Sequence, residues 1–195
     1  QTAVVLQADA MGDVHFRQGR MNCVACHDGT SMHDSEGANH RYEGEQGPSC
    51  ESCHDQVGKT GDTNVQHQIH QDILSCQVCH SVTYTSCDSC HVQVSETTGN
   101  AIYKTAATYL TFYIGHNTRQ SEERPYEYVP VRHVPVDPES FAYYGDDLLS
   151  NFDLMPNWAY ATPHNIQRNT PQTETCNSCH GNEEIFLTAD KIKPE

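Results

Sequence analysis

The chemistry-bearing residues of this chain follow one repeated pattern. Each of its ten cysteines belongs to a Cys-x-x-Cys-His sequence, and there are five such motifs, at 23–27, 50–54, 76–80, 87–91 and 176–180. Histidine makes up 13 of the 195 residues, so the chance of a histidine after all five pairs is roughly one in a million. The motif cysteines are Cys23, Cys26, Cys50, Cys53, Cys76, Cys79, Cys87, Cys90, Cys176 and Cys179, and the motif histidines are His27, His54, His80, His91 and His180.

Covalent haem explains this pattern best. Two thiols three residues apart on a turn of helix add to the two vinyl groups of haem, and the adjacent histidine points its imidazole at the iron. Zinc sites of the four-cysteine type need Cys-x-x-Cys pairs in twos, and five is odd. Disulfides in a secreted protein do not require a histidine after each pair. The sequence therefore predicts five haem c groups bound through the ten cysteines.

The remaining histidines outnumber the five irons and predict bis-histidine ligation. His15, His40, His67 and His164 lie eight to twelve residues before a motif, and His70 is a spare next to His67. We predict that these five are the second axial ligands, with His33 as the alternative to His40 and His133 as the first reserve. The partner of each haem is left open, and His67 and His70 could serve two different haems. The eight histidines outside the motifs are His15, His33, His40, His67, His70, His116, His133 and His164.

The elements that position these residues are expected to be short. Residues 1–96 form a haem-dense region with four motifs, 97–163 a Tyr- and Pro-rich insert without cysteine, and 164–195 a C-terminal region with the fifth motif. A helix is expected over 66–80 and another from Thr170-Pro171 through 180. Strands are expected within 102–114 and 126–136, and loops over 28–49 and 55–66. The expected fold is mostly irregular, with short α-helices and a few short strands packed around a chain of haems.

Composition limits the other possibilities. The apolar fraction is 36% and the net charge is −15, which is too polar for a self-sufficient hydrophobic core. Five porphyrins would supply the missing apolar surface. The acidity argues against nucleic acid as a partner, and the sequence has no apolar stretch long enough to predict a transmembrane helix. We interpret the chain as a mature, exported protein of the periplasm or cell exterior.

The motif-bearing parts resemble the multihaem c-type cytochromes. His67-Gln68-Ile69-His70 followed by Cys76 is similar to the opening of the class III tetrahaem cytochromes, and this resemblance implies that both histidines are second ligands to different haems. Size and haem count are similar to those of small periplasmic pentahaem carriers, and the sparse expected structure is similar to that of extracellular cytochrome filament subunits. The family implies electron transfer.

We therefore expect an electron carrier, not an enzyme, because two axial imidazoles leave no open iron position for a substrate. A multihaem reductase is the alternative from another class. Expected partners are redox proteins or extracellular electron acceptors. Self-association into a conductive filament, with a histidine donated to a neighbouring subunit, is weighed against a soluble periplasmic monomer.

Overall fold

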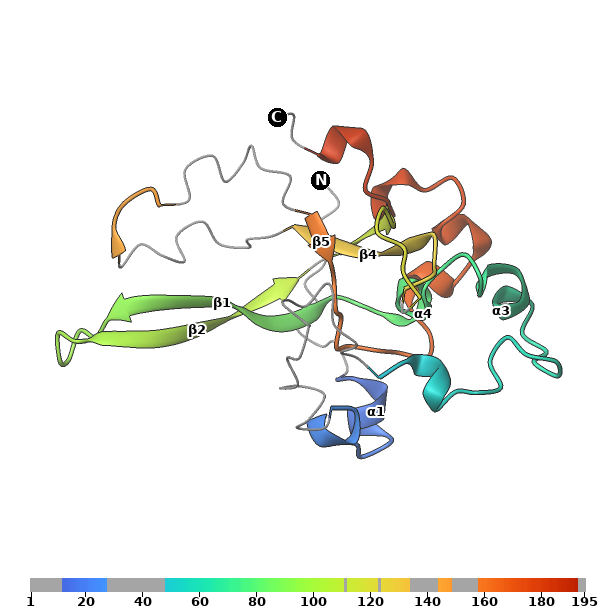
Figure 1. Ribbon diagram of the computed structural model, residues 1–195, viewed down its shortest axis with the longest axis horizontal. Coiled ribbons are helices and arrows are strands. Elements are labelled where there is room, and N and C mark those ends of the chain that lie inside the picture. Colours follow the sequence, from blue (N-terminus) through green and yellow to red (C-terminus); the bar gives the residue numbers. More distant parts are fainter. Residues whose placement is uncertain are drawn as a thin grey trace.

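A computed structural model describes residues 12–27, 48–110, 112–122, 124–133, 144–148 and 158–192. Within these ranges, only the backbone is described for residues 85–93, 103–110 and 133. The described part is mostly irregular, with short helices and two small antiparallel sheets (Figure 1). The coarse fold prediction is confirmed in this respect.

The helical elements are single turns or little more. Local polar side chains begin several of them: Asp13 caps the first helix, Ser49 the turn of the second motif and Asn64 the helix before the third motif. Each of these side chains accepts a hydrogen bond from an otherwise unpaired backbone N–H. The elements are α1 (Val14–Arg17), η1 (Cys23–Ala25), η2 (Cys50–Ser52), α3 (Val65–His70), α4 (Cys76–His80), η4 (Pro171–Thr173), η5 (Cys176–Ser178), η6 (Glu183–Ile185) and η7 (Ala189–Lys191).

The prediction of one helix over 66–80 was wrong, because this stretch contains two helices, α3 and α4. Between them the backbone bonds to a strand instead of continuing the helix. The N–H of Tyr128 donates to the carbonyl of Ile73, and the N–H of Ser75 donates to the carbonyl of Tyr128. Tertiary pairing has overridden the local helical pattern here.

The helix predicted from Thr170 through 180 is also interrupted. Thr170 is the N-cap with Pro171 at the first position, as predicted, but η4 ends at Thr173. Thr175 then forms a second capping box with Ser178 and starts η5. Two consecutive caps divide the expected helix into two 3₁₀ turns.

The strands form two separate sheets. β1 (Tyr84–Val94) pairs with β2 (Ala101–Leu110) in a hairpin that projects from the rest of the molecule in Figure 1. The second sheet has the order β3-β4-β5. The region 102–114, within which short strands were predicted, therefore contributes to both sheets. The second sheet consists of β3 (Tyr113–His116), β4 (Tyr128–His133) and β5 (Trp158–Tyr160).

The apolar core of the described part is small. Its buried hydrophobic residues lie on α4, the start of β1 and the second sheet, and they are Val78, Tyr84, Ile114, Val129, Val131 and Ala161. Several large apolar side chains are instead exposed, among them Phe16 at 70% and Val24 at 73%. The protein therefore places its small packed centre around α4, the helix of the third motif.

Candidate cofactor-binding sites

Four of the five motifs adopt the same local turn. In each, both cysteines and the histidine lie on or directly after one helical turn, η1, η2, α4 or η5. The N–H groups of His27, His54 and His180 donate to the carbonyl of the first cysteine of their own motif at 2.8–2.9 Å. The turn of helix that thioether attachment requires is thus present in these four motifs.

The fourth motif, 87–91, differs because it lies within strand β1. The pairing with β2 shifts between Ser86 and Ser89, so that Cys87 and Asp88 stand opposite the single residue Ala107. This is a β-bulge, which locally bends the strand and leaves one residue unpaired. The side chains of Cys87, Cys90 and His91 lie outside the described atoms.

The structure brings motif histidines together with histidines from outside the motifs. Four pairs have ring centroids 6.0–6.2 Å apart. Every pair joins one motif histidine to one other histidine. We number each site by its motif: site 1 is His27 with His164, site 2 is His54 with His15, site 3 is His80 with His67, and site 5 is His180 with His70.

The spacing of these pairs matches that of two imidazoles on one metal ion. A metal–nitrogen bond of about 2.0 Å and a nitrogen-to-centroid distance of about 1.1 Å place two opposed ring centroids roughly 6.2 Å apart. The interplanar angles vary from 36° to 63°. Two imidazole rings on opposite sides of one metal ion can adopt any rotation relative to each other about the N–metal–N line. These interplanar angles are therefore compatible with ligation of one ion by both rings.

The hydrogen bonds of the rings select the nitrogen that can bind a metal. Five of the paired histidines have Nδ1 within 2.8–3.2 Å of a carboxylate or backbone carbonyl oxygen. Nδ1–H is then the donor, which leaves the Nε2 lone pair as the ligating atom. The acceptors are Asp13 for His15, Asp62 for His67, the Gln66 carbonyl for His70, the Gln167 carbonyl for His80 and the Thr162 carbonyl for His164.

Asp62 is itself held as an anion. Its carboxylate accepts hydrogen bonds from the backbone N–H groups of Gly58 and Asn64 and a further one at His67 Nδ1. The two backbone donors, followed by the histidine, lower the pKa of Asp62 to about 2. An ionised acceptor behind His67 increases the basicity of the imidazole.

One further observation fits a large apolar group at these sites. Exposed apolar side chains lie beside the paired histidines: Phe16 follows His15, Val24 lies between the cysteines of the first motif, and Ile69 lies between His67 and His70. A porphyrin bound between the rings would cover this surface.

The described thiols are free, and one thiol of the third motif, Cys76, lies beside the second motif. Cys76 Sγ lies 3.6 Å from Glu51 Oε1, and the hydroxyl of Tyr126 also donates to this carboxylate oxygen. A hydrogen bond from the Cys76 thiol lowers the pKa of Cys50 to about 7. The free cysteines are Cys23, Cys26, Cys50, Cys53, Cys76, Cys79, Cys176 and Cys179.

Of the predicted second ligands, His15, His67, His70 and His164 each lie against a motif histidine. His40, like its alternative His33, lies outside the described residues, as does the side chain of the reserve His133. His116 is exposed on β3, and its ring contacts Tyr128 at 5.8 Å. Ligation itself stays a prediction.

A histidine that precedes a motif in the sequence does not in general pair with the histidine of that motif. Only His67 pairs with the motif that follows it, whereas His15 pairs with the second motif and His164 with the first. A local signal for two of the supporting contacts was present in the sequence: Asp13 and Thr162 each stand two residues before the histidine they support.

In the described ranges, no group of three or more His, Cys, Asp or Glu side chains could hold a bare metal ion. None of the described helices has the length and apolarity to cross a membrane. No protein-family model, curated protein or solved structure matches the chain.

Proposed function

We propose that this protein is an electron carrier with five covalently bound c-type haems. The observation that carries the proposal is the set of four histidine pairs, each joining a motif histidine to another histidine at 6.0–6.2 Å. Unliganded pairs of this kind have no evident structural purpose, because neither ring hydrogen-bonds to the other. Their spacing and the bonds at Nδ1 suit bis-histidine ligation.

The residues that would hold each haem follow from the pairs. The two cysteines of a motif form the thioether bonds, the motif histidine is the proximal ligand, and the second histidine is the distal ligand. A haem iron held in this way accepts and passes on single electrons without binding a substrate. The role of the protein is to fix the distances between the haems and to set the basicity of each imidazole, as Asp62 does for His67.

The experiment that tests the proposal is a haem count on the protein made in a host with the haem-attachment machinery. We expect five covalent haems per chain by pyridine haemochrome assay and mass spectrometry. Replacing both cysteines of one motif with serine should lower the count by one. A chain that carries no covalent haem under these conditions would overturn the proposal.

A multihaem reductase is the alternative from the enzyme class. It requires a five-coordinate iron with an open distal position. Binding of carbon monoxide to the reduced wild-type protein would favour this alternative. We expect no such binding at sites 1, 2, 3 and 5, because both axial positions are supplied by the chain.

The proposed setting is outside the cytoplasm, either as a monomeric periplasmic carrier or as a subunit of an extracellular filament. His116 on β3 supports the second possibility, because it is exposed and its ring contacts Tyr128, not a histidine, among the described residues. It could thus ligate the haem of a second copy. Sedimentation distinguishes the monomer from the filament. A filament should shorten or dissociate on His116→Ala or His133→Ala. A monodisperse wild-type monomer with five bis-histidine haems would exclude the filament.

A further inference from the structure

We propose that sites 1, 2, 3 and 5 form a single row in that order, with site 3 between sites 2 and 5. This inference rests on the proposed function and adds to it the path that electrons take through the chain. Three junctions, each formed by residues of two neighbouring sites, support the order.

The junction between sites 3 and 5 is the most extensive. Helix α3 carries His67 of site 3 and His70 of site 5, which at i and i+3 lie on one face of the helix. The C-terminal region also bonds directly to α4. The Thr170 hydroxyl donates to the Cys79 carbonyl at 2.5 Å, and Gln172 Nε2 donates to the carbonyls of Val78 and Ser81 at 3.1 and 2.6 Å.

A thiol of the fifth motif contacts the same residue that bonds to α4. Cys179 Sγ lies 3.5 Å from the carbonyl oxygen of Gln172, and Gln172 Nε2 donates to the carbonyl of Val78 on α4. One residue therefore joins the cysteine-bearing turns of sites 3 and 5.

The junction between sites 2 and 3 involves a thiol of the third motif. Cys76 Sγ lies 3.6 Å from Oε1 of Glu51, which stands between the two cysteines of the second motif. The third motif thus contacts the second motif through Cys76 and the C-terminal region through the Cys79 carbonyl. This places site 3 in the middle.

The junction between sites 1 and 2 connects their two distal histidines. Asp13 holds His15 of site 2 through Oδ1, and its Oδ2 accepts the N–H of Ile166 at 2.8 Å. The N–H of Val14 donates to the Ile166 carbonyl at 2.9 Å. Ile166 is two residues after His164 of site 1, so this short segment links the ligands of sites 1 and 2, and its next residue, Gln167, also supports His80 of site 3.

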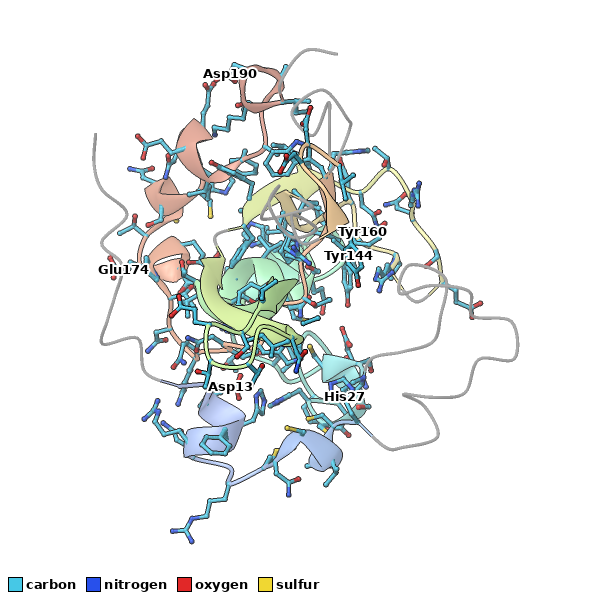
Figure 2. All side chains as sticks on the ribbon, turned by 90° about the vertical axis from the view of Figure 1, so that its left-hand side faces the viewer. Asp13, His27, Tyr144, Tyr160, Glu174 and Asp190 are labelled. Atoms are coloured by element: carbon cyan, nitrogen blue, oxygen red, sulfur yellow. The ribbon has the colours of Figure 1, made fainter. Side chains whose placement is uncertain are left out.

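The arrangement in space agrees with this order. Figure 1 shows α1 and the first motif (blue) at one end, the cyan turn of the second motif next, α4 in the centre and the orange-red C-terminal turns beyond it. Figure 2, turned by 90°, shows His27 and Asp13 at the same end and Glu174 and Asp190 progressively further away.

The test uses pairs of distal-ligand variants of the haem-loaded protein. His67→Ala with His70→Ala opens sites 3 and 5, which are neighbours in the row. His15→Ala with His70→Ala opens sites 2 and 5, which site 3 separates. Dipolar broadening between two high-spin irons falls with the cube of their distance. We therefore expect the high-spin resonance to lose amplitude and broaden in the first double variant, and to equal the sum of the two single variants in the second.

Broadening in the His15→Ala, His70→Ala variant without broadening in the His67→Ala, His70→Ala variant would overturn the order and leave the proposed function intact. Single variants that keep five covalent haems but show no high-spin iron would instead contradict the ligand pairs and thus the proposed function. Iron positions from anomalous diffraction of the wild type provide a readout without any substitution. They support the row if iron 3 lies closer to both iron 2 and iron 5 than these two irons lie to each other, and refute it otherwise.

Discussion

Five of the eight paired histidines are held by a hydrogen bond at Nδ1. His164, His70 and His80 use backbone carbonyls as acceptors, whereas His15 and His67 use carboxylates. Carboxylate acceptors increase the electron donation of the imidazole more than neutral carbonyls do. The two kinds of support therefore give the sites different ligand strengths.

Removing one distal histidine should open one iron. In His70→Ala we expect one of five haems to become high-spin while all five stay covalently attached, because the cysteines of the fifth motif are untouched. The optical and electron paramagnetic resonance spectra measure this change. The matched control is His116→Ala, which removes an exposed histidine whose ring contacts Tyr128 and should leave the high-spin fraction of the isolated subunit unchanged. An unchanged spectrum in His70→Ala would reject the assignment of His70.

Removing the carboxylate behind His67 should raise the reduction potential of one haem. Asp62→Ala deletes the anionic acceptor at 2.8 Å from Nδ1, which lowers the basicity of the ligand. We expect an upward shift of about 60 mV, equivalent to a tenfold change for a one-electron couple. Spectroelectrochemical titration measures it. Asp72→Ala is the control, since it removes the same charge from an exposed position nearby; equal shifts in both variants would contradict a specific role for Asp62.

At the scale of elements, α4 connects the second sheet with the C-terminal region. It carries the third motif, contributes buried Val78 to the core and bonds to the C-terminal region through Thr170 and Gln172. The neighbouring Ser81 is fully buried. A substitution at the contact between α4 and the C-terminal region should therefore change the free energy of unfolding of the whole described part.

Thr170→Val should destabilise the protein measurably. Thr170 is 3% exposed, and its hydroxyl donates to the Cys79 carbonyl. Valine has nearly the same shape but leaves that carbonyl without its donor, at an expected cost of about 1–3 kcal/mol in the free energy of unfolding. Chemical denaturation of the haem-loaded protein measures this. The exposed Thr63→Val should change the free energy of unfolding by less than about 0.5 kcal/mol; equal effects at both positions would contradict the proposed junction.

The sequence predicted the kind of element better than its extent. The strands within 102–114 and 126–136 and the cap at Thr170 were predictable because β-branched runs and Thr-Pro pairs act locally. The break between α3 and α4 was not, since it depends on the distant strand residue Tyr128. The position of the fourth motif on a bulged strand had no local signal that we recognised. The histidine partners were likewise unpredictable, because they join segments up to 137 residues apart, as His27 and His164 do.

At the scale of the whole molecule, charge repulsion opposes folding and the small apolar core does little to offset it. The net charge is −15 with a mean hydropathy of −0.69, and the described core contains few large side chains. Large apolar residues are instead exposed next to the paired histidines. In the proposed function, the five haems would bury this apolar surface.

The chain without haem should not fold. Produced without the attachment machinery, it should give a random-coil circular dichroism spectrum, because the four histidine pairs and the apolar residues beside them would have nothing to pack against. The haem-loaded protein, measured under the same conditions, is the control. A cooperative thermal transition in the haem-free chain would contradict this expectation.

The central claim is that histidine ligates iron on both sides, and near-infrared magnetic circular dichroism of the haem-loaded wild type tests it most directly. The position of the charge-transfer band reports the pair of axial ligands of low-spin ferric haem. We expect a single band at the energy of bis-histidine ligation, with an intensity that corresponds to five haems per chain. A methionine-to-iron band, or a high-spin band from sites 1, 2, 3 or 5, would contradict the account.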